Sequence, residues 1–451
     1  MSVILQNGFI GIEQDLNHPR LCWRKLAGTV TASTEEEGFD AEFAYAEELV
    51  NAWKPTAVPA DWMIEFPSSA PVSYVGIGAH TLGTDGASVR LQRDGDLVTN
   101  LLTRSEEFDD AAYSKFRGTV FANTTIAPDG TATADSFIEG GTSGEHYVDR
   151  SFSVTEGDVY TFSTHVKSLS GNRVFQLRTA SNAGINIINL DLSTGTVTTV
   201  ASASIVSSGA VELTDGWFRV FMTITATGTG NGIFRHQLID GSSLSAVYTG
   251  DGVSGLIFWG AQLNEGGPAT YVRTAGTTAS SDWHDVVSWV LPEADDAILF
   301  LFEPFEADRV RVVIGAAIAE IGYILVGRVT EFPRKARFTG LPITESQQVE
   351  YRDNTSMTGK PLGRTLQRDG LEFSVEIDNL PETFRADEWR AFREAMERGG
   401  RQFFFYAARP EKYPDEVALA WQRQPAPFDR AIPNARISGS IAMTCGGYRQ
   451  P

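Results

Sequence analysis

Apolar and polar residues alternate along much of this chain. Residues 62–66 place Trp, Ile and Phe at every second position, and residues 287–291 do the same with Val, Trp and Leu. A period of two is typical of β-strands that bury one face. The run AILFLFEPF (297–305) is almost continuously apolar, which is typical of a strand covered on both faces. The pattern therefore predicts a mainly β protein.

The clearest alternation lies between residues 97 and 280. Tyr160, Phe162 and Val166 alternate with polar residues, and residues 175–178 and 217–224 repeat this pattern. Turn-forming sequences separate the segments, among them TEGD, SGN, STG and TDG. Many short strands at regular spacing predict a sandwich or jelly roll for this part of the chain.

Two segments have a helical pattern instead. FAYAEELVNAW (43–53) resembles a helix and is followed by two prolines. Near 386–398, Trp389, Phe392 and Met396 fall at positions i, i+3 and i+7, and a glycine pair follows. This spacing places one apolar stripe along a helix, and glycine is a common residue just beyond a helix end. We therefore expect one well-defined helix in the last third of the chain.

One hairpin is interrupted by a long stretch of sequence. SVRLQRDGD (88–96) contains Asp94-Gly95, a pair that favours tight turns, and the matching strand DWHDVV begins only at residue 282. We therefore expect Gly95 and Trp283 to be neighbours, with a domain inserted at an exposed loop tip. The predicted fold class is a multi-domain β protein in which one jelly roll is inserted into another. The predicted domains are a split jelly roll at 1–95 and 282–330, an insert at 97–280, and a C-terminal β-sandwich with one helix at 331–451.

Several segments of the split domain resemble discoidin-like jelly rolls, the coagulation-factor 5/8 type C family. They are DWMIEF (61–66), VSYVGIG (72–78), SVRLQRDGD (88–96), DWHDVV (282–287) and RVRVVI (309–314). The ligand loops of that family are not recognisable here. The resemblance therefore implies a fold for this part of the chain and no lipid or glycan binding by it.

The insert resembles carbohydrate-binding-module-like domains of bacteriophage tail and fibre proteins. The matching segments are NLLTRSEEFDDAAYSK (100–115), APDGTATAD (127–135), DGWFRVFMTI (215–224) and FWGAQLNEGGPATYVRT (258–274). The C-terminal domain, with RQFFFYAARPEKYPDEVALAW (401–421), is similar to the distal-tail and tail-tube-like domains of siphophage tails. These resemblances imply a virion protein of a phage tail tip or baseplate. They also imply other tail proteins as partners, a homo-oligomeric ring of three or six copies, and host surface polysaccharide as ligand.

Charge and length narrow the partners further. The 451 residues carry a formal net charge of −20, which disfavours nucleic acid and anionic membrane surfaces as partners. No apolar run is long enough for a membrane helix, so we expect no membrane insertion. The N-terminus lacks the pattern of a signal peptide, so we expect assembly in the host cytoplasm. Cys22 and Cys445 are either two reduced thiols or one disulfide.

Motifs of catalysis are missing from the sequence. It contains no Walker loop, no dinucleotide-binding glycine motif, no HExxH and no GxSxG. The six histidines show no metal-ligand spacing. Carboxylates are plentiful, but a glycosidase pair requires a fixed separation across a cleft, which a sequence does not show. We therefore expect a protein that is not an enzyme and that needs no cofactor.

The insert offers a candidate glycan-binding set. Sugars present hydroxyl groups and one apolar face, so their sites combine aromatic rings with fixed polar groups. Polar residues opposite the core positions, together with nearby aromatic residues, give six candidates. They are Tyr147, Gln176, Arg178, Arg235, Gln237 and Trp259.

Each candidate also has a purely structural interpretation. Trp259 aligns with apolar neighbours and would then be a core residue, while Arg178 and Arg235 would only solvate an outer face. As ligand groups, the two arginines would clamp hydroxyls or an acidic sugar. Asp109, Asp110 and Glu265 are candidate ligands for a structural calcium ion, or ordinary loop charges.

The sequence therefore predicts a phage tail protein whose insert binds host glycan during adsorption. Two alternatives stay open. One is a glycan-degrading tail enzyme in which the insert is a targeting module. The other is a purely structural tail component in which the insert is decorative.

Overall fold

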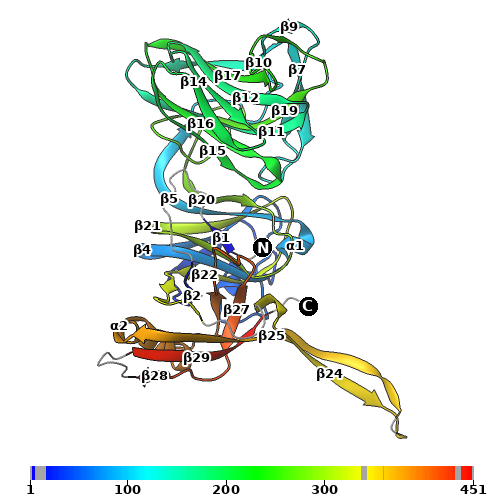
Figure 1. The fold of residues 1–451 in the computed structure, drawn as a ribbon, viewed down its shortest axis with the longest axis vertical. Helices are drawn as coiled ribbons and strands as arrows, with labels where there is room; N and C mark the ends of the chain where they lie inside the picture. Colours follow the sequence, from blue (N-terminus) through cyan, green and yellow to red (C-terminus); the bar gives the residue numbers. More distant parts are fainter. Residues whose placement is uncertain (1–2, 6–16, 337–342, 359, 432–437, 449–451) are drawn as a thin grey trace. The chain divides into compact units, whose positions relative to one another are not determined.

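The computed structural model describes residues 3–5, 17–336, 343–358, 360–431 and 438–448, and it is mainly β, as predicted. The described chain divides into two compact units. Unit 2 comprises Arg90–Val290. Unit 1 combines the residues before it, up to Val89, with those from Leu291 onward (Figure 1).

Unit 2 is a sandwich of two six-stranded antiparallel sheets (Figure 1). The first sheet has the order β14 (Thr196–Ala201), β13 (Asn186–Asp191), β12 (Arg173–Ser181), β17 (Gly230–Asp240), β10 (His146–Val154), β6 (Ser114–Phe116). The second has the order β15 (Ile205–Glu212), β16 (Phe218–Thr225), β11 (Val159–Ser170), β19 (Gly255–Glu265), β8 (Ala134–Glu139), β7 (Gly118–Thr125). A short pair, β9 (Ser143–Gly144) with β18 (Tyr248–Thr249), lies outside both sheets.

The inward positions of these strands form one hydrophobic core. Phe162 on β11, Phe175 on β12, Phe234 on β17 and Phe258 on β19 are all fully buried in it. Alternation explains the arrangement, because successive side chains of a strand point to opposite faces of a sheet. Every polar residue between two core positions of the first sheet therefore points to its outer face.

Two long strands form the ends of unit 2. β5 (Ser88–Asn100) and β20 (Ala279–Val290) are hydrogen-bonded neighbours, and the His284 ring lies 2.7 Å from the Asp96 carbonyl oxygen. The backbone of Gly95 lies so close to this ring that a Cβ there would be 2.7 Å from it. Gly95 thus lies beside His284, the residue that follows Trp283 in the sequence. Gly95 is within strand β5 rather than at a turn. The expected domain limits fall inside these two paired strands.

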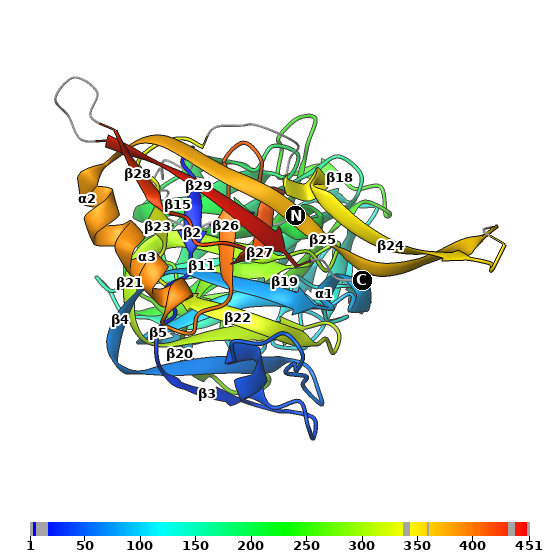
Figure 2. The ribbon, with the colours of Figure 1, turned by 90° about the horizontal axis from the view of Figure 1, so that it is seen from below.

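Unit 1 contains two sheets. In the first, β4 (Ala60–His80) pairs with β21 (Ile298–Gly315), β22 (Ile321–Gly327) and β3 (Thr29–Ala32), while β1 (Val3–Leu5) pairs with β21. The second has the order β23 (Thr330–Glu331), β2 (Arg20–Cys22), β26 (Phe404–Ala407), β27 (Val417–Gln422), β29 (Ser438–Gly447), β25 (Pro361–Pro381), β24 (Gln347–Thr355). β28 (Phe428–Ala431) pairs with β29, and β24 and β25 extend away from the rest of the sheet (Figure 2).

The two sheets of unit 1 share a hydrophobic cluster. Tyr74 and Leu299 of the first sheet pack in it with Phe405 and Leu419 of the second. β2 from the N-terminal segment lies between β23 and β26, so the second sheet is built from both ends of the chain. The limit expected near residue 330 therefore runs through one continuous core. Cys22 and Cys445 are buried free thiols.

Helical structure is sparse in the described chain. α2 (Glu382–Phe384), η4 (Arg385–Trp389) and α3 (Arg390–Glu397) follow one another without a break, at the place where a helix near 386–398 was predicted. Trp389 and Phe392 are buried in the core of the second sheet. The other short helices of the described chain are η1 (Ala41–Tyr45), α1 (Leu82–Asp85), η2 (Thr214–Gly216) and η3 (Ile343–Glu345).

The helix expected at 43–53 is wrong. Only η1 (Ala41–Tyr45) forms, as a short 3₁₀-helix, and the backbone at Ala46 is already extended. Tertiary contacts explain the difference, because Glu47 accepts hydrogen bonds from Arg401 and from the backbone amide of Gln402. Trp53 pairs in turn with Ile321 as an isolated bridge. A continuous helix would break these contacts, and helix propensity is too weak to compensate.

Candidate functional site

The outer face of the first sheet of unit 2 brings five of the six predicted glycan residues together. The strand register places Tyr147, Gln237 and Gln176 directly opposite one another across β10, β17 and β12. The same register line reaches β6 on one side and β13 and β14 on the other. We call this line the aromatic–amide row; its members are Phe116, Tyr147, Gln237, Gln176, Asn189 and Thr198.

A second register line runs beside the first. Arg178 on β12 lies opposite Arg235 on β17, and Arg235 lies opposite Asp149 on β10. The spacing of two residues along each strand puts both lines on the same face of the sheet. The predicted polar set therefore forms one continuous surface rather than scattered solvated positions.

Aromatic rings and guanidinium groups are stacked at the β6 end of the row. The rings of Phe116 and Tyr147 are nearly parallel, with centroids 5.0 Å apart. The guanidinium of Arg117 lies 4.5 Å from the centroid of Phe116, and that of Arg235 lies 3.4 Å from the centroid of Tyr147. Both contacts are cation–π interactions. Phe116 remains 40% exposed and is therefore the most accessible ring of the row.

The two glutamines of the row differ in their hydrogen bonds. The Gln176 amide donates to Asn189 Oδ1 at 2.8 Å. Gln237 is fully buried, and neither its amide nitrogen nor its amide oxygen has a protein hydrogen-bond partner. Buried polar groups are nearly always paired in native proteins, so an unpaired amide calls for a specific explanation. The amide of Gln237 lies beside the stacked rings of Phe116 and Tyr147.

Arg178 and Arg235 are already neutralised by carboxylates. Arg178 donates to Glu145 at 3.3 Å, and Arg235 donates to Glu145 at 3.2 Å and to Asp149 at 3.1 Å. Two cations, Arg178 and Arg235, therefore face two carboxylates and are balanced by them. A guanidinium whose charge is compensated in this way attracts an acidic sugar less than a free one. The geometry favours an uncharged ligand.

Trp259 lies elsewhere in unit 2. It is on β19 of the second sheet, is only 2% exposed, and donates its indole N–H to Thr133 Oγ1 at 2.9 Å. It packs with Trp217 and Ile257 in a separate apolar cluster. The structure therefore gives Trp259 a core position and does not bring it to the face that carries the other five residues.

The residues proposed for calcium do not form one cluster. Asp110 Oδ1 accepts a hydrogen bond from the backbone amide of Ala112, and the ammonium group of Lys115 contacts the backbone carbonyls of Asp109 and Asp110. Glu265 is exposed at the end of β19. Among the residues that the structure describes, no group of three or more His, Cys, Asp or Glu side chains is arranged to hold a metal ion.

Two other buried carboxylates of unit 2 are held by protein groups. Glu139 receives two hydrogen bonds from Arg173, at 2.8 and 2.6 Å, and one from the Tyr248 hydroxyl at 2.5 Å. Glu106 receives a hydrogen bond from Tyr271 at 2.9 Å, and burial raises its pKa to about 6. These contacts satisfy the carboxylate oxygens, which is typical of structural rather than ligand-binding groups.

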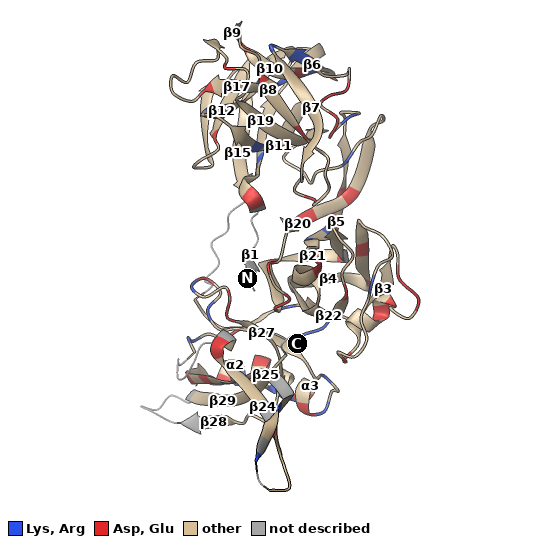
Figure 3. Ribbon diagram, turned by 90° about the vertical axis from the view of Figure 1, so that its right-hand side faces the viewer, with Lys and Arg blue, Asp and Glu red and all other residues tan. Residues whose placement is uncertain are grey.

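Acidic residues occur in both units, interspersed with Lys and Arg (Figure 3). This distribution agrees with the net charge of −20. No helix in the described part of the chain has the length and apolarity that crossing a bilayer requires.

No family model matches this sequence, and no curated protein does either. Solved structures with similar folds are mostly carbohydrate-binding modules or domains associated with glycoside hydrolases. One contains the CBM22-1 and GH10 modules of a Clostridium thermocellum xylanase with xylohexaose (16% identity, 40% of this chain, 30% of that chain, TM-score 0.24). Another is a carbohydrate-binding module of Cellvibrio mixtus lichenase 5A with cellotriose (9% identity, 37% of this chain, 99% of that chain, TM-score 0.22). A third is the enzymatically active domain of tailspike protein 4 of bacteriophage CBA120 (10% identity, 37% of this chain, 21% of that chain, TM-score 0.22). The match thus spans less than a third of the xylanase chain.

Sequence reasoning missed several members of the face. Phe116 belongs to a strand of only three residues, which is too short to show a period. Asn189, Glu145 and Asp149 were also overlooked, although Asn189 alternates with the core residues of β13. The alternation on β13 was a usable signal for Asn189. The role of the two carboxylates depends on cross-strand contacts that no local pattern reveals.

Proposed function

We propose that unit 2 is a non-catalytic glycan-binding module whose ligand is an uncharged saccharide. The observation that carries this proposal is the unpaired amide of Gln237 beside the exposed aromatic stack of Phe116 and Tyr147. A sugar supplies what this surface lacks, because its hydroxyls both donate and accept hydrogen bonds and its C–H face packs on aromatic rings.

Binding at this face requires a rearrangement of side chains. Arg235 covers the ring of Tyr147 at 3.4 Å, and Gln237 is enclosed by its neighbours in the sheet. We propose that the sugar takes the place of the Arg235 guanidinium on this ring. Glu145 and Asp149 then keep the displaced guanidinium paired. The amide of Gln237 gains its missing partners from the sugar hydroxyls.

The first experiment compares two exposed phenylalanines of unit 2. The full-length protein is screened on an array of neutral oligosaccharides, with sialylated and sulfated counterparts, and the best ligand is then titrated. We expect Phe116→Ala to weaken binding about tenfold or more, the equivalent of ~1.4 kcal/mol. The matched control is Phe121→Ala on β7, because Phe121 is 47% exposed and belongs to the other sheet. Equal effects of the two substitutions, or binding of acidic glycans only, would contradict the proposal.

For the whole chain we propose the role of a structural protein of a phage tail tip or baseplate, with unit 2 as its host-binding module. The support is the resemblance of residues 100–115, 258–274 and 401–421 to domains of phage tail proteins. Single sugar sites often bind near the millimolar end of the affinity range. A ring of three or six copies would raise the avidity by roughly 10²–10⁴.

Deletion of residues 97–280 from the phage gene tests this role. We expect particles to assemble and to lose adsorption to the host. Normal adsorption would indicate a decorative insert. Release of reducing sugars from host polysaccharide by the purified protein would instead indicate an enzyme and would refute the non-catalytic proposal.

A further inference from the structure

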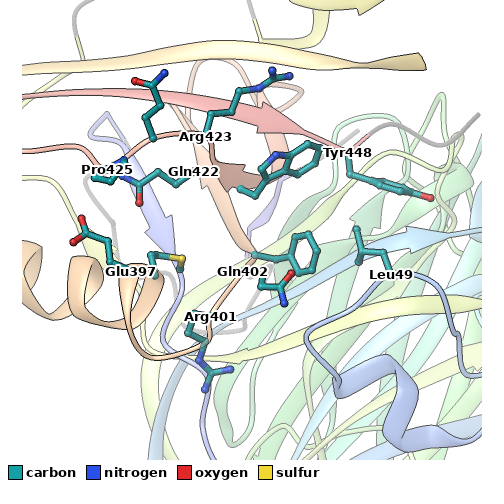
Figure 4. A pocket seen from close by; sticks show the side chains of 12 residues that line it. Leu49, Glu397, Arg401, Gln402, Gln422, Arg423, Pro425 and Tyr448 are labelled. Atoms are coloured by element: carbon teal, nitrogen blue, oxygen red, sulfur yellow. The ribbon is translucent and has the colours of Figure 1, made fainter. Parts of the chain in front are cut away.

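Unit 1 contains a cavity of about 660 Å³. It lies among the end of α3, the start of β26, the end of β27 and the residue after β29 (Figure 4). This volume is within the range of small-ligand sites, roughly 300–1,000 Å³. A second cavity of about 650 Å³ shares Trp421, Gln422 and Arg423 with the first. The two together suit an elongated ligand better than a compact one.

The charged side chains around the first cavity are compensated. Three of them line it, and each forms an ion pair with a residue that does not. The pairs are Arg401 with Glu47 (2.5 Å), Arg423 with Glu372 (3.1 Å) and Glu397 with Arg393 (2.8 Å). An anionic or cationic ligand would therefore have to compete with pairs that already exist, and the lining favours an uncharged ligand.

The uncharged lining groups provide an aromatic surface and a fixed polar group. Trp421 is half-buried and lies against the backbone of Gly446, so closely that a Cβ at Gly446 would be 2.6 Å from the indole. This close contact fixes the ring across the neighbouring strand. Gln422 follows Trp421 on β27, so its side chain lies on the other side of the strand end, and its amide nitrogen is buried without a protein partner. Tyr448 borders the same cavity (Figure 4).

We propose that this cavity is a second saccharide site, specific for a neutral linear oligosaccharide. The indole of Trp421 packs on the apolar face of one sugar ring, and the Gln422 amide donates to a hydroxyl. The chain of sugars continues past Trp421 into the adjoining cavity. This site lies wholly within unit 1, so it is independent of the proposal for unit 2.

The test uses the full-length protein in which the unit 2 face is disabled by Phe116→Ala and Gln237→Met. This background is screened on the array of neutral oligosaccharides, and its best ligand is titrated. We expect binding to persist and to fall about tenfold or more on adding Gln422→Met. Methionine preserves the side-chain length, and Gln422 Nε2 has no protein hydrogen bond to lose, so folding should be unaffected.

Trp421→Ala should abolish this remaining binding. Trp283→Ala is the matched control, because Trp283 is also half-buried and lines neither cavity. Three results would overturn the proposal: no neutral oligosaccharide bound by the disabled background, bound oligosaccharide unaffected by Gln422→Met, or a change of oligomeric state on Trp421→Ala with sugar binding intact. The last result would identify the cavity as a contact between copies of the chain.

Discussion

Gln237→Met should make unit 2 more stable and less able to bind glycan. A buried polar group without a partner costs about 1–3 kcal/mol relative to a paired one. Methionine has a similar length and carries no amide, so the substitution should raise the free energy of unfolding by ~1 kcal/mol. A gain in stability with a loss of binding is the behaviour expected of a residue kept for function.

Gln176→Met is the matched control. Gln176 lies directly opposite Gln237 in the strand register and is also buried, but its amide donates to Asn189 at 2.8 Å. Removing this bond leaves the Asn189 oxygen without a donor, so we expect a loss of ~1 kcal/mol. The two substitutions should therefore differ by ~2 kcal/mol, or about thirtyfold in the unfolding equilibrium.

Native-state hydrogen exchange measures this difference within unit 2. The amides of β12 and β17 exchange through opening of the sandwich, so their protection follows the stability of this unit rather than of the whole chain. Isothermal titration with the best neutral glycan completes the comparison. If Gln237→Met destabilises the sheet as much as Gln176→Met does, the amide has a structural partner and our interpretation of it is wrong.

Three further substitutions test two buried carboxylates of unit 2 and the packing of Trp421 in unit 1. Because burial raises the pKa of Glu106 to about 6, the folded state binds this proton more tightly than the unfolded chain, and stability is lost as the pH rises from about 4.5 to 6. Urea unfolding gives the free energy of unfolding of Glu106→Gln and of the wild type. The variant should gain ~2 kcal/mol relative to the wild type between pH 4 and pH 7. A difference that does not change with pH would contradict the raised pKa of Glu106. Glu139→Ala removes the two hydrogen bonds of Arg173 to a buried carboxylate and leaves this arginine only its longer ion pairs with Asp251 (3.6 Å) and Asp240 (3.8 Å). It should cost ~3 kcal/mol by hydrogen exchange in unit 2, and a loss below ~1 kcal/mol would mean that the pair is effectively solvated. Gly446→Ala places a methyl group 2.6 Å from the indole of Trp421, so a crystal structure of this variant should show the ring displaced, and an unmoved ring would contradict the packing.

The sequence was most informative where one local pattern repeats over several strands. Alternation predicted the sandwich of unit 2, and the apolar stripe through Trp389 and Phe392 predicted the helix. The helix expected at 43–53 failed because Glu47 and Trp53 make long-range contacts that no window of sequence contains. For the same reason, the position of β2 between β23 and β26 was not foreseen, since three residues carry no period.

The candidate site was predictable in part. Alternation alone placed Gln176, Arg178, Arg235 and Gln237 opposite core positions, and the structure puts them on one face. Their order across the sheet depends on strand register, which is fixed by pairing between distant segments. Trp259 also obeys the alternation, but loops that carry Thr133 and Trp217 cover it. Hydrophobic pattern does not distinguish an exposed outer face from one covered by loops.

The decisive measurement is a structure of the full-length protein bound to its best neutral oligosaccharide. We expect a sugar ring packed on Tyr147 in place of the Arg235 guanidinium, with hydroxyls hydrogen-bonded to the Gln237 amide. A sugar held only by loops or by the second sheet of unit 2, with Arg235 still stacked on Tyr147 and Gln237 still unpaired, would contradict it.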